Sequence, residues 1–174
     1  MLRLFILRHA NTAWALPGQR DIDRELNEEG ISDLAIIGGW IRKQNIAPGQ
    51  VYCSTATRTR ATLAGISKSF TNTPTIEFVP SFYSGFMDEY LDTVRETENS
   101  EDIMLIGHNP TCASLVSMLL STDDIEGSLA ASSSFPAGAM AAIDFNIEQW
   151  SDLKEGTGKL ADFYIPRAAQ RYDA

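Results

Sequence analysis

Two short stretches of this chain are apolar at nearly every position, and they limit the possible folds more than any other feature. Residues 2–7 read LRLFIL and residues 103–106 read IMLI. A strand is apolar on both faces when helices cover both sides of its sheet, as happens in parallel sheets. The chain is therefore expected to build a central sheet with helices on each side.

Amphipathic, helix-like patterns follow the strand-like runs along the chain. Four such alternations predict a three-layer α/β fold, with a mostly parallel central sheet flanked by helices and with right-handed crossovers. The last two strands can be antiparallel. Strands are expected at residues 2–7, 51–53, 76–79, 103–106, 139–145 and 160–165, and helices from Asn27 to before Pro48, from about Arg58 through Phe70, from Met87 through Val94 and from Cys112 through Leu119.

The size of the chain limits how many domains it can form. A length of 174 residues with 44% apolar residues is enough for one sizeable core and too small for two ordinary domains. No internal repeat or linker divides the sequence. Residues 1–174 are therefore expected to form a single domain, with a loosely held tail after about residue 166.

The charge balance and the cysteines limit the partners and the location. The sequence has 14 Lys and Arg against 23 Asp and Glu, and this net charge of −9 argues against general affinity for nucleic acid or anionic membranes. No apolar run reaches the ~18–20 residues of a membrane span, and the apolar start is too short for a signal peptide. Cys53 and Cys112 lack metal-type spacing and are expected to be buried thiols, so a cytoplasmic location is expected.

Candidate site residues follow the ends of three predicted strands, at 8–12, 54–62 and 107–109. Ligands of open α/β sheets bind at this edge. The chain has only two histidines, and His9 and His108 each directly follow one of the two most apolar strands. With Arg8 and Arg58, they could surround a tetrahedral oxyanion and supply one neutral nitrogen nucleophile. The alternative is that both histidines are structural and bind neighbouring carbonyl groups.

Four sequence blocks carry a resemblance to a known family. Residues 7–10, LRHA, resemble the LRHG signature of the histidine phosphatase (phosphoglycerate mutase-like) superfamily, with Ala10 in place of glycine. Residues 23–30, 54–62 and 107–110 resemble three further blocks of the same superfamily. The short length, the lack of an inserted lid and the late Trp150 look like the compact phosphohistidine phosphatases of the SixA type.

This resemblance implies a phosphoglycerate mutase-like fold and a role for each matching residue. It implies that His9 is the nucleophile and becomes transiently phosphorylated, while Arg8, Arg58 and His108 bind the phosphoryl oxygens. It implies no metal and no cofactor. The expected substrate is a phosphohistidine-bearing protein, such as a phosphotransfer domain, and the alternative is a small phosphorylated molecule.

Three further residues are candidates for substrate binding. Asn11 and Thr12 follow the nucleophile and could donate to the phosphate, or could be there because turns favour them. Arg24 belongs to a block that lies near the pocket mouth in related proteins. It could meet the substrate or form an ion pair with Asp21 or Glu28.

The general acid and the signature alanine are the weak points of the resemblance. Asp88 and Glu89 lie where larger relatives carry an acid, but they also suit the solvated start of a helix. Phosphohistidine needs such an acid less than a phosphate ester does, because its imidazole leaves more easily. Ala10 would be strained if its position required a positive φ.

Two rival functions come from other classes. In a cysteine-dependent phosphatase Cys53 would need an arginine six positions later, but that position is Thr59 and Arg58 comes one residue early. A noncatalytic phosphate-binding module would have little use for His9.

Overall fold

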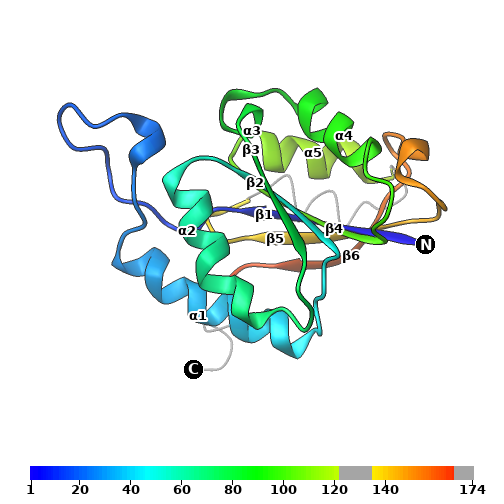
Figure 1. Cartoon of the computed structure of the whole chain (residues 1–174), viewed down its shortest axis with the longest axis horizontal. Coiled ribbons are helices and arrows are strands. Elements are labelled where there is room, and N and C mark those ends of the chain that lie inside the picture. Colours follow the sequence, from blue (N-terminus) through cyan, green and yellow to red (C-terminus); the bar gives the residue numbers. More distant parts are fainter. Residues whose placement is uncertain (122–134, 167–174) are drawn as a thin grey trace.

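The computed structural model describes residues 1–121 and 135–166. Its centre is a six-stranded sheet with the order β3-β2-β4-β1-β5-β6 (Figure 1). Strands β1 to β4 run parallel to one another, while β5 is antiparallel to both β1 and β6. The predicted α/β fold is confirmed. The strands are β1 (Leu2–Arg8), β2 (Gln50–Ser54), β3 (Thr75–Val79), β4 (Asp102–Gly107), β5 (Met140–Phe145) and β6 (Lys159–Tyr164).

Helices cover both faces of this sheet (Figure 1). Helices α1 (Glu28–Lys43) and α2 (Thr57–Ile66) lie on one face, and α3 (Ser81–Ser84), α4 (Met87–Arg95) and α5 (Thr111–Leu119) lie on the other. Three short 3-10 helices complete the described elements: η1 (Asp21–Asp23), η2 (Ser67–Ser69) and η3 (Trp150–Asp152).

Strand β1 shows why the apolar run at the start of the chain predicted this fold. Successive side chains of a strand point to opposite faces. Leu4 and Ile6 belong to the core cluster under α4 and α5, whereas Phe5 and Leu7 belong to the cluster under α1 and α2. All four side chains are buried. The strand therefore has to be apolar on both faces.

The predicted elements differ from the observed ones mainly at helix ends. Helix α1 begins after Asn27, whose side chain accepts a hydrogen bond of 2.7 Å from the Gly30 backbone N–H and so caps the helix. Helix α2 ends at Ile66, because the chain tightens there into η2, and Phe70 lies beyond the helix that was expected to include it. Helix α3 was not predicted, since one turn is too short for a periodic pattern. The tail expected after residue 166 lies outside the described residues.

The sheet topology brings the predicted site together. Strands β1, β4 and β2 are neighbours and parallel, with Arg8 beside Gly107 and Cys53 beside Ile106. The carboxyl ends of these strands therefore meet at one edge, next to the N-terminus of α2. The long connection between β1 and α1 leaves this edge and projects past α1 and α2 in Figure 1.

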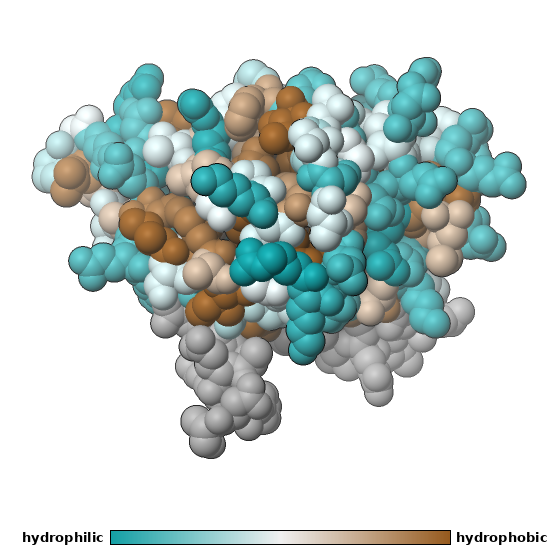
Figure 2. Space-filling model, turned by 60° about the horizontal axis from the view of Figure 1, so that its bottom comes forward, coloured by the Kyte–Doolittle hydropathy of each residue, from teal (hydrophilic) through white to brown (hydrophobic). Residues whose placement is uncertain are grey.

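The surface on the α1 side of the molecule is mostly hydrophilic. Figure 2 shows hydrophobic side chains there in separate small patches among hydrophilic ones. None of the helices that the structure describes has the length and apolar character needed to cross a membrane.

Candidate active site

His9 follows the last residue of β1 and is 8% exposed. Its Nδ1 lies 2.8 Å from the carbonyl oxygen of Ala10. A carbonyl only accepts hydrogen bonds, so Nδ1 carries the proton and Nε2 keeps its lone pair. Burial, with the positive charges of Arg58 and Arg8 added, lowers the pKa of His9 to about 4, although the bond to Ala10 acts the other way. At neutral pH His9 is therefore a neutral imidazole with a nucleophilic Nε2.

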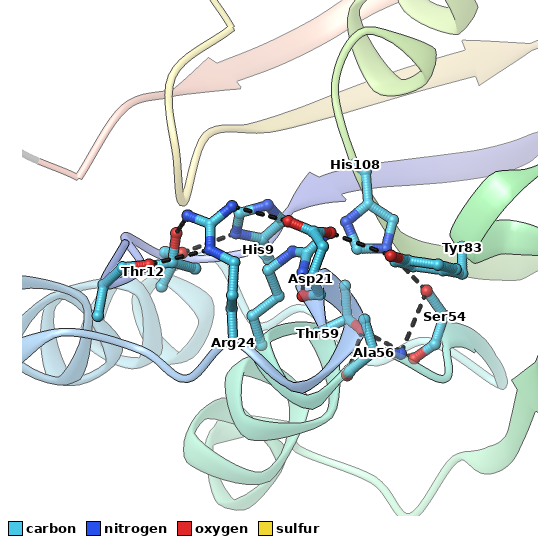
Figure 3. A network of polar contacts seen from close by, with 12 residues as sticks. His9, Thr12, Asp21, Arg24, Ser54, Ala56, Thr59, Tyr83 and His108 are labelled. Carbon is cyan, nitrogen blue, oxygen red and sulfur yellow. Dashed lines mark hydrogen bonds and ion pairs between the residues drawn. The ribbon is translucent and has the colours of Figure 1, made fainter. Parts of the chain in front are cut away.

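His108 follows β4 and lies next to His9, with ring centroids 5.3 Å apart. Its Nε2 is 2.8 Å from the Ser54 hydroxyl at the end of β2. Its Nδ1 is buried, has no hydrogen-bond partner in the described part of the chain, and lies on the side of Asp21 in Figure 3. Burial first, and then the charge of Arg58, lowers the pKa of His108 to about 3. Both rings are therefore neutral at pH 7.

Two arginines flank the histidines. Arg8 ends β1, and its Nη1 donates a hydrogen bond of 2.9 Å to the carbonyl oxygen of Phe135. The Arg8 Nε is buried and has no partner among residues 1–121 and 135–166. Arg58 lies in the first turn of α2 and is 6% exposed. The site therefore places two positive groups beside two neutral rings, an arrangement suited to an oxyanion.

The connection between β1 and α1 reaches back to this site through Asp21. Arg58 Nη1 donates to the Asp21 backbone oxygen at 2.7 Å, and Arg58 Nη2 to the Asp21 carboxylate at 3.0 Å. The same carboxylate accepts from Arg24 Nη1 at 3.0 Å and from the Tyr83 hydroxyl at 3.1 Å. Figure 3 shows Asp21 between Arg24 and Tyr83, close to the two histidines.

The remaining predicted substrate ligands are placed differently from one another. Arg24 joins the site and forms an ion pair with Asp21, one of the two acids, Asp21 and Glu28, that the sequence suggested as its partner. Thr12 accepts a hydrogen bond of 2.6 Å from Arg24 Nη2, which links it to the ion pair between Arg24 and Asp21. The amide nitrogen of Asn11 lies 3.4 Å from Asp33 of α1, which turns this side chain toward the helix.

Asp21, Tyr83 and Ser54 were not singled out as site residues by the sequence. Asp21 was considered only as an ion-pair partner of Arg24, and Tyr83 lies in a short helix without a periodic signal. The clue for Tyr83 was its place just after β3, the segment where an acid was sought. The carboxylates considered there, Asp88 and Glu89, lie on the exposed first turn of α4.

Ala10 fits the loop after β1 without strain. Among the described residues, only Asn45 has a positive φ without being glycine. Ala10 is fully buried, and its backbone N–H donates to the Thr62 hydroxyl at 3.0 Å. The position therefore needs a small side chain, and alanine satisfies it.

The cysteines are placed as inert thiols. Cys53 and Cys112 are both buried and free. Burial raises the pKa of each thiol to about 12, so neither is a thiolate at neutral pH. This argues against a cysteine nucleophile. In the part of the chain that the structure describes, no group of three or more His, Cys, Asp or Glu side chains could hold a metal ion.

Comparisons with known proteins agree with this geometry. The family model of the histidine phosphatase superfamily (branch 1) matches residues 4–80. An uncharacterised protein of Mycobacterium tuberculosis is 31% identical over 166 residues, which cover 92% of this chain and all of that protein.

Two solved structures are similar over nearly their whole length. A SixA protein of Agrobacterium tumefaciens, whose name gives phosphohistidine phosphatase as its suggested activity, is 30% identical with a TM-score of 0.80, and the match covers 95% of this chain and 98% of that one. A SixA protein of Nakamurella, named in the same way, is 28% identical with a TM-score of 0.77, covering 95% and 96% of the two chains. The chain belongs to the histidine phosphatase superfamily, where it is a SixA-like phosphatase.

Proposed function

We propose that this protein hydrolyses phosphohistidine on proteins through a covalent phosphohistidine intermediate at His9. The observation that carries the proposal is the hydrogen bond of 2.8 Å from His9 Nδ1 to the Ala10 carbonyl. It fixes the tautomer in which Nε2 has the lone pair, and the lowered pKa of about 4 keeps the ring unprotonated at neutral pH. The nucleophile is thus ready without a partner base.

Three residues bind the phosphoryl group in this proposal. Arg8 Nε and His108 Nδ1 are the buried nitrogen atoms whose hydrogen bonds are not used by the described protein atoms. Arg58 contributes N–H groups beyond those that hold Asp21. For His108 to donate from Nδ1, the Ser54 hydroxyl has to donate to Nε2, and the separation of 2.8 Å allows it. Ser54 is then a positioning residue that sets the tautomer of His108.

The reaction has two displacements at phosphorus. In the first, His9 Nε2 forms a bond to phosphorus, the P–N bond of the substrate breaks, and its electron pair stays on the departing imidazole, which takes a proton from water. In the second, a water oxygen attacks phosphorus and the bond to His9 Nε2 breaks. Inorganic phosphate leaves and the water proton passes to solvent, so His9 returns to its starting form.

The electrostatics of the site favour a P–N substrate over an ester. The Asp21 carboxylate contacts Arg58, a proposed phosphate ligand, and the hydrogen bond from Arg24, with Arg58 and Tyr83 assisting, lowers its pKa. It is therefore ionised at neutral pH and is a poor proton donor. An alkoxide leaving group depends on such a donor, whereas imidazole can take its proton from solvent.

A protein partner is supported by the surroundings of the site. The connection that carries Asp21 also carries Trp14 and Leu16, whose exposed fractions are 88% and 69%, and Phe86 near Tyr83 is 81% exposed. Exposed aromatic and aliphatic side chains of this kind are common in protein interfaces. We propose a cytoplasmic phosphohistidine-bearing protein, such as a phosphotransfer domain, as the partner.

The test compares substrates and traps the intermediate. The wild-type protein should release phosphate from a phosphohistidine protein with a higher kcat/KM than from small phosphate esters. Labelled substrate quenched in alkali, where phosphohistidine survives, should leave label on His9. Higher efficiency on the esters would refute the proposed substrate, and label on any other residue would refute the proposed nucleophile.

A further inference from the structure

The carboxylate of Asp21 is held in the mouth of the site, and the phosphatase reaction described above does not need it. It contacts Arg58, a proposed phosphate ligand, and also Arg24 and Tyr83. These contacts come from three separate parts of the chain: α2, the connection before α1, and α3. Asp21 is therefore fixed in place by more groups than a free surface carboxylate would be.

The Asp21 carboxylate is open to solvent beside the proposed phosphate ligand Arg58. Its side chain is 52% exposed, while the Arg58 side chain it contacts is 8% exposed. The hydrogen bond from Arg24 lowers the pKa of Asp21, so the carboxylate is negative at neutral pH. An incoming phosphate thus meets a fixed negative charge beside the buried guanidinium.

This negative charge has different consequences for different leaving groups. A substrate with a second anionic group near its phosphoryl group would normally pair that group with a neighbouring arginine. Here the Asp21 carboxylate already accepts one hydrogen bond from Arg58 and one from Arg24, and it repels another anion at short range. A neutral or positively charged leaving group, such as imidazole, suffers no such repulsion.

We propose that Asp21 is a specificity-determining residue that excludes phosphorylated substrates carrying a second negative charge next to the scissile phosphoryl group. The inference deepens the proposed function and rests on it, because it assigns the choice among phosphorylated molecules to one side chain. Metabolites with a carboxylate or second phosphate beside the phosphoryl group would bind poorly, while a phosphorylated protein side chain would be accepted.

The kinetic test uses two small substrates that differ by one charge. Glycerol 3-phosphate and 3-phosphoglycerate share the phosphoryl group and the carbon chain, but only the second has a carboxylate. Asp21→Asn should raise the catalytic efficiency toward the carboxylated substrate, relative to the uncarboxylated one, by about tenfold. The ratio cancels any effect that the substitution has on how Arg58 binds the phosphoryl group, because both substrates carry the same phosphoryl group.

Asp23→Asn is the matched control. Asp23 lies on the same 3-10 helix but pairs with the exposed Arg20, with 2.6 Å between Arg20 Nε and the carboxylate. The same loss of one charge at this position should change the ratio less than twofold. An equal change in both variants would show a general effect of net charge and overturn the proposal.

A binding measurement separates this inference from the catalytic one. Calorimetry with methylphosphonate and with phosphonoacetate compares the same charge difference on ligands that are not hydrolysed. Asp21→Asn should tighten phosphonoacetate about tenfold more than methylphosphonate. If the protein shows this difference in binding but no turnover, the phosphatase function is refuted and the role of Asp21 in selecting ligands stands. If it shows turnover but Asp21→Asn tightens both ligands equally, the role of Asp21 is refuted and the phosphatase function stands.

Discussion

The two halves of the site are built on different principles. The half at the sheet edge holds His9, His108 and Arg58, all less than 9% exposed and carried by elements that pack into the core. The half on the connection between β1 and α1 holds Asp21 and Arg24, which are more exposed and are held by ion pairs and hydrogen bonds. The first half fixes protonation states by burial, and the second sets charge at the entrance.

The two halves can therefore serve different purposes, the buried half for catalysis and the exposed half for substrate selection. Burial lowers the pKa of both histidines, and only a packed sheet edge can exclude water well enough to do so. The connection cannot supply such burial, but its charged side chains can be exchanged without disturbing the core. Substitutions in the two halves should therefore change different kinetic constants.

Replacing His9 should have the largest effect. His9→Ala removes the nucleophile, so we expect turnover of a phosphohistidine protein to fall by about 10⁴-fold or more. The melting temperature should change little, because His9 lies at a strand end and not in the apolar core. Residual activity above a hundredth of the wild-type value, as an order of magnitude, would contradict the assignment.

Replacing His108 should reduce catalysis less than replacing His9. His108→Ala removes one preorganised donor, which typically costs ~10²–10³ in kcat. Ser54→Ala keeps the His108 ring but removes the hydroxyl that sets its tautomer, and should lower kcat about tenfold. Steady-state kinetics of both variants would test the order, and a Ser54→Ala protein as active as the wild type would remove the positioning role of that hydroxyl.

Acidification should destabilise the fold through the same two histidines. Their pKa values are about 4 and about 3 in the folded protein, and near 6.5 when unfolded. Between these values the unfolded chain binds protons that the folded chain does not, so stability is fully present above about pH 6.5 and is lost as the pH falls toward 4. Each histidine should contribute about 2 kcal/mol of this loss between pH 7 and pH 5.

Denaturant titrations of the wild type and of His9→Ala at both pH values would measure this contribution. The sequence has only two histidines, so the double variant His9→Ala, His108→Ala should lose most of the dependence over this range. A pH dependence that is unchanged in the double variant would show that the rings are not held neutral by burial.

Replacing Arg24 should have the smallest effect and should act on binding. Arg24 holds three oxygen atoms, those of the Ala13 carbonyl, the Thr12 hydroxyl and the Asp21 carboxylate, at 3.0, 2.6 and 3.0 Å. Arg24→Gln should loosen the connection and raise KM by about three- to tenfold, with kcat nearly unchanged. If Arg24→Gln lowers kcat and leaves KM unchanged, Arg24 acts like the residues at the sheet edge, and the proposed difference between the two halves of the site is wrong.

Much of this protein could be read from the sequence because the relevant signals are local. The apolar runs of β1 and β4 identify buried strands, and a residue that directly follows such a strand has its position set by the sheet. His9, Arg8 and His108 could therefore be chosen as candidates, and Arg58 because it opens the helix after β2. Helix ends were less predictable, as the stop of α2 before Phe70 shows.

The hydrogen-bond partners of these side chains could not be read from the sequence. Arg58 meets Asp21 across 37 positions and His108 meets Ser54 across 54, and no periodic pattern encodes contacts of such separation. The tautomer of His9 is set by the carbonyl of its neighbour Ala10, but the burial that lowers its pKa and the pairing of Arg58 with Asp21 require parts of the chain that meet only in the folded protein. Which residues reach the edge of the sheet could be read from short stretches of sequence, because a continuous apolar run depends only on residues that are neighbours in the chain. Their protonation and pairing depend on water exclusion and on neighbours that are adjacent only after folding.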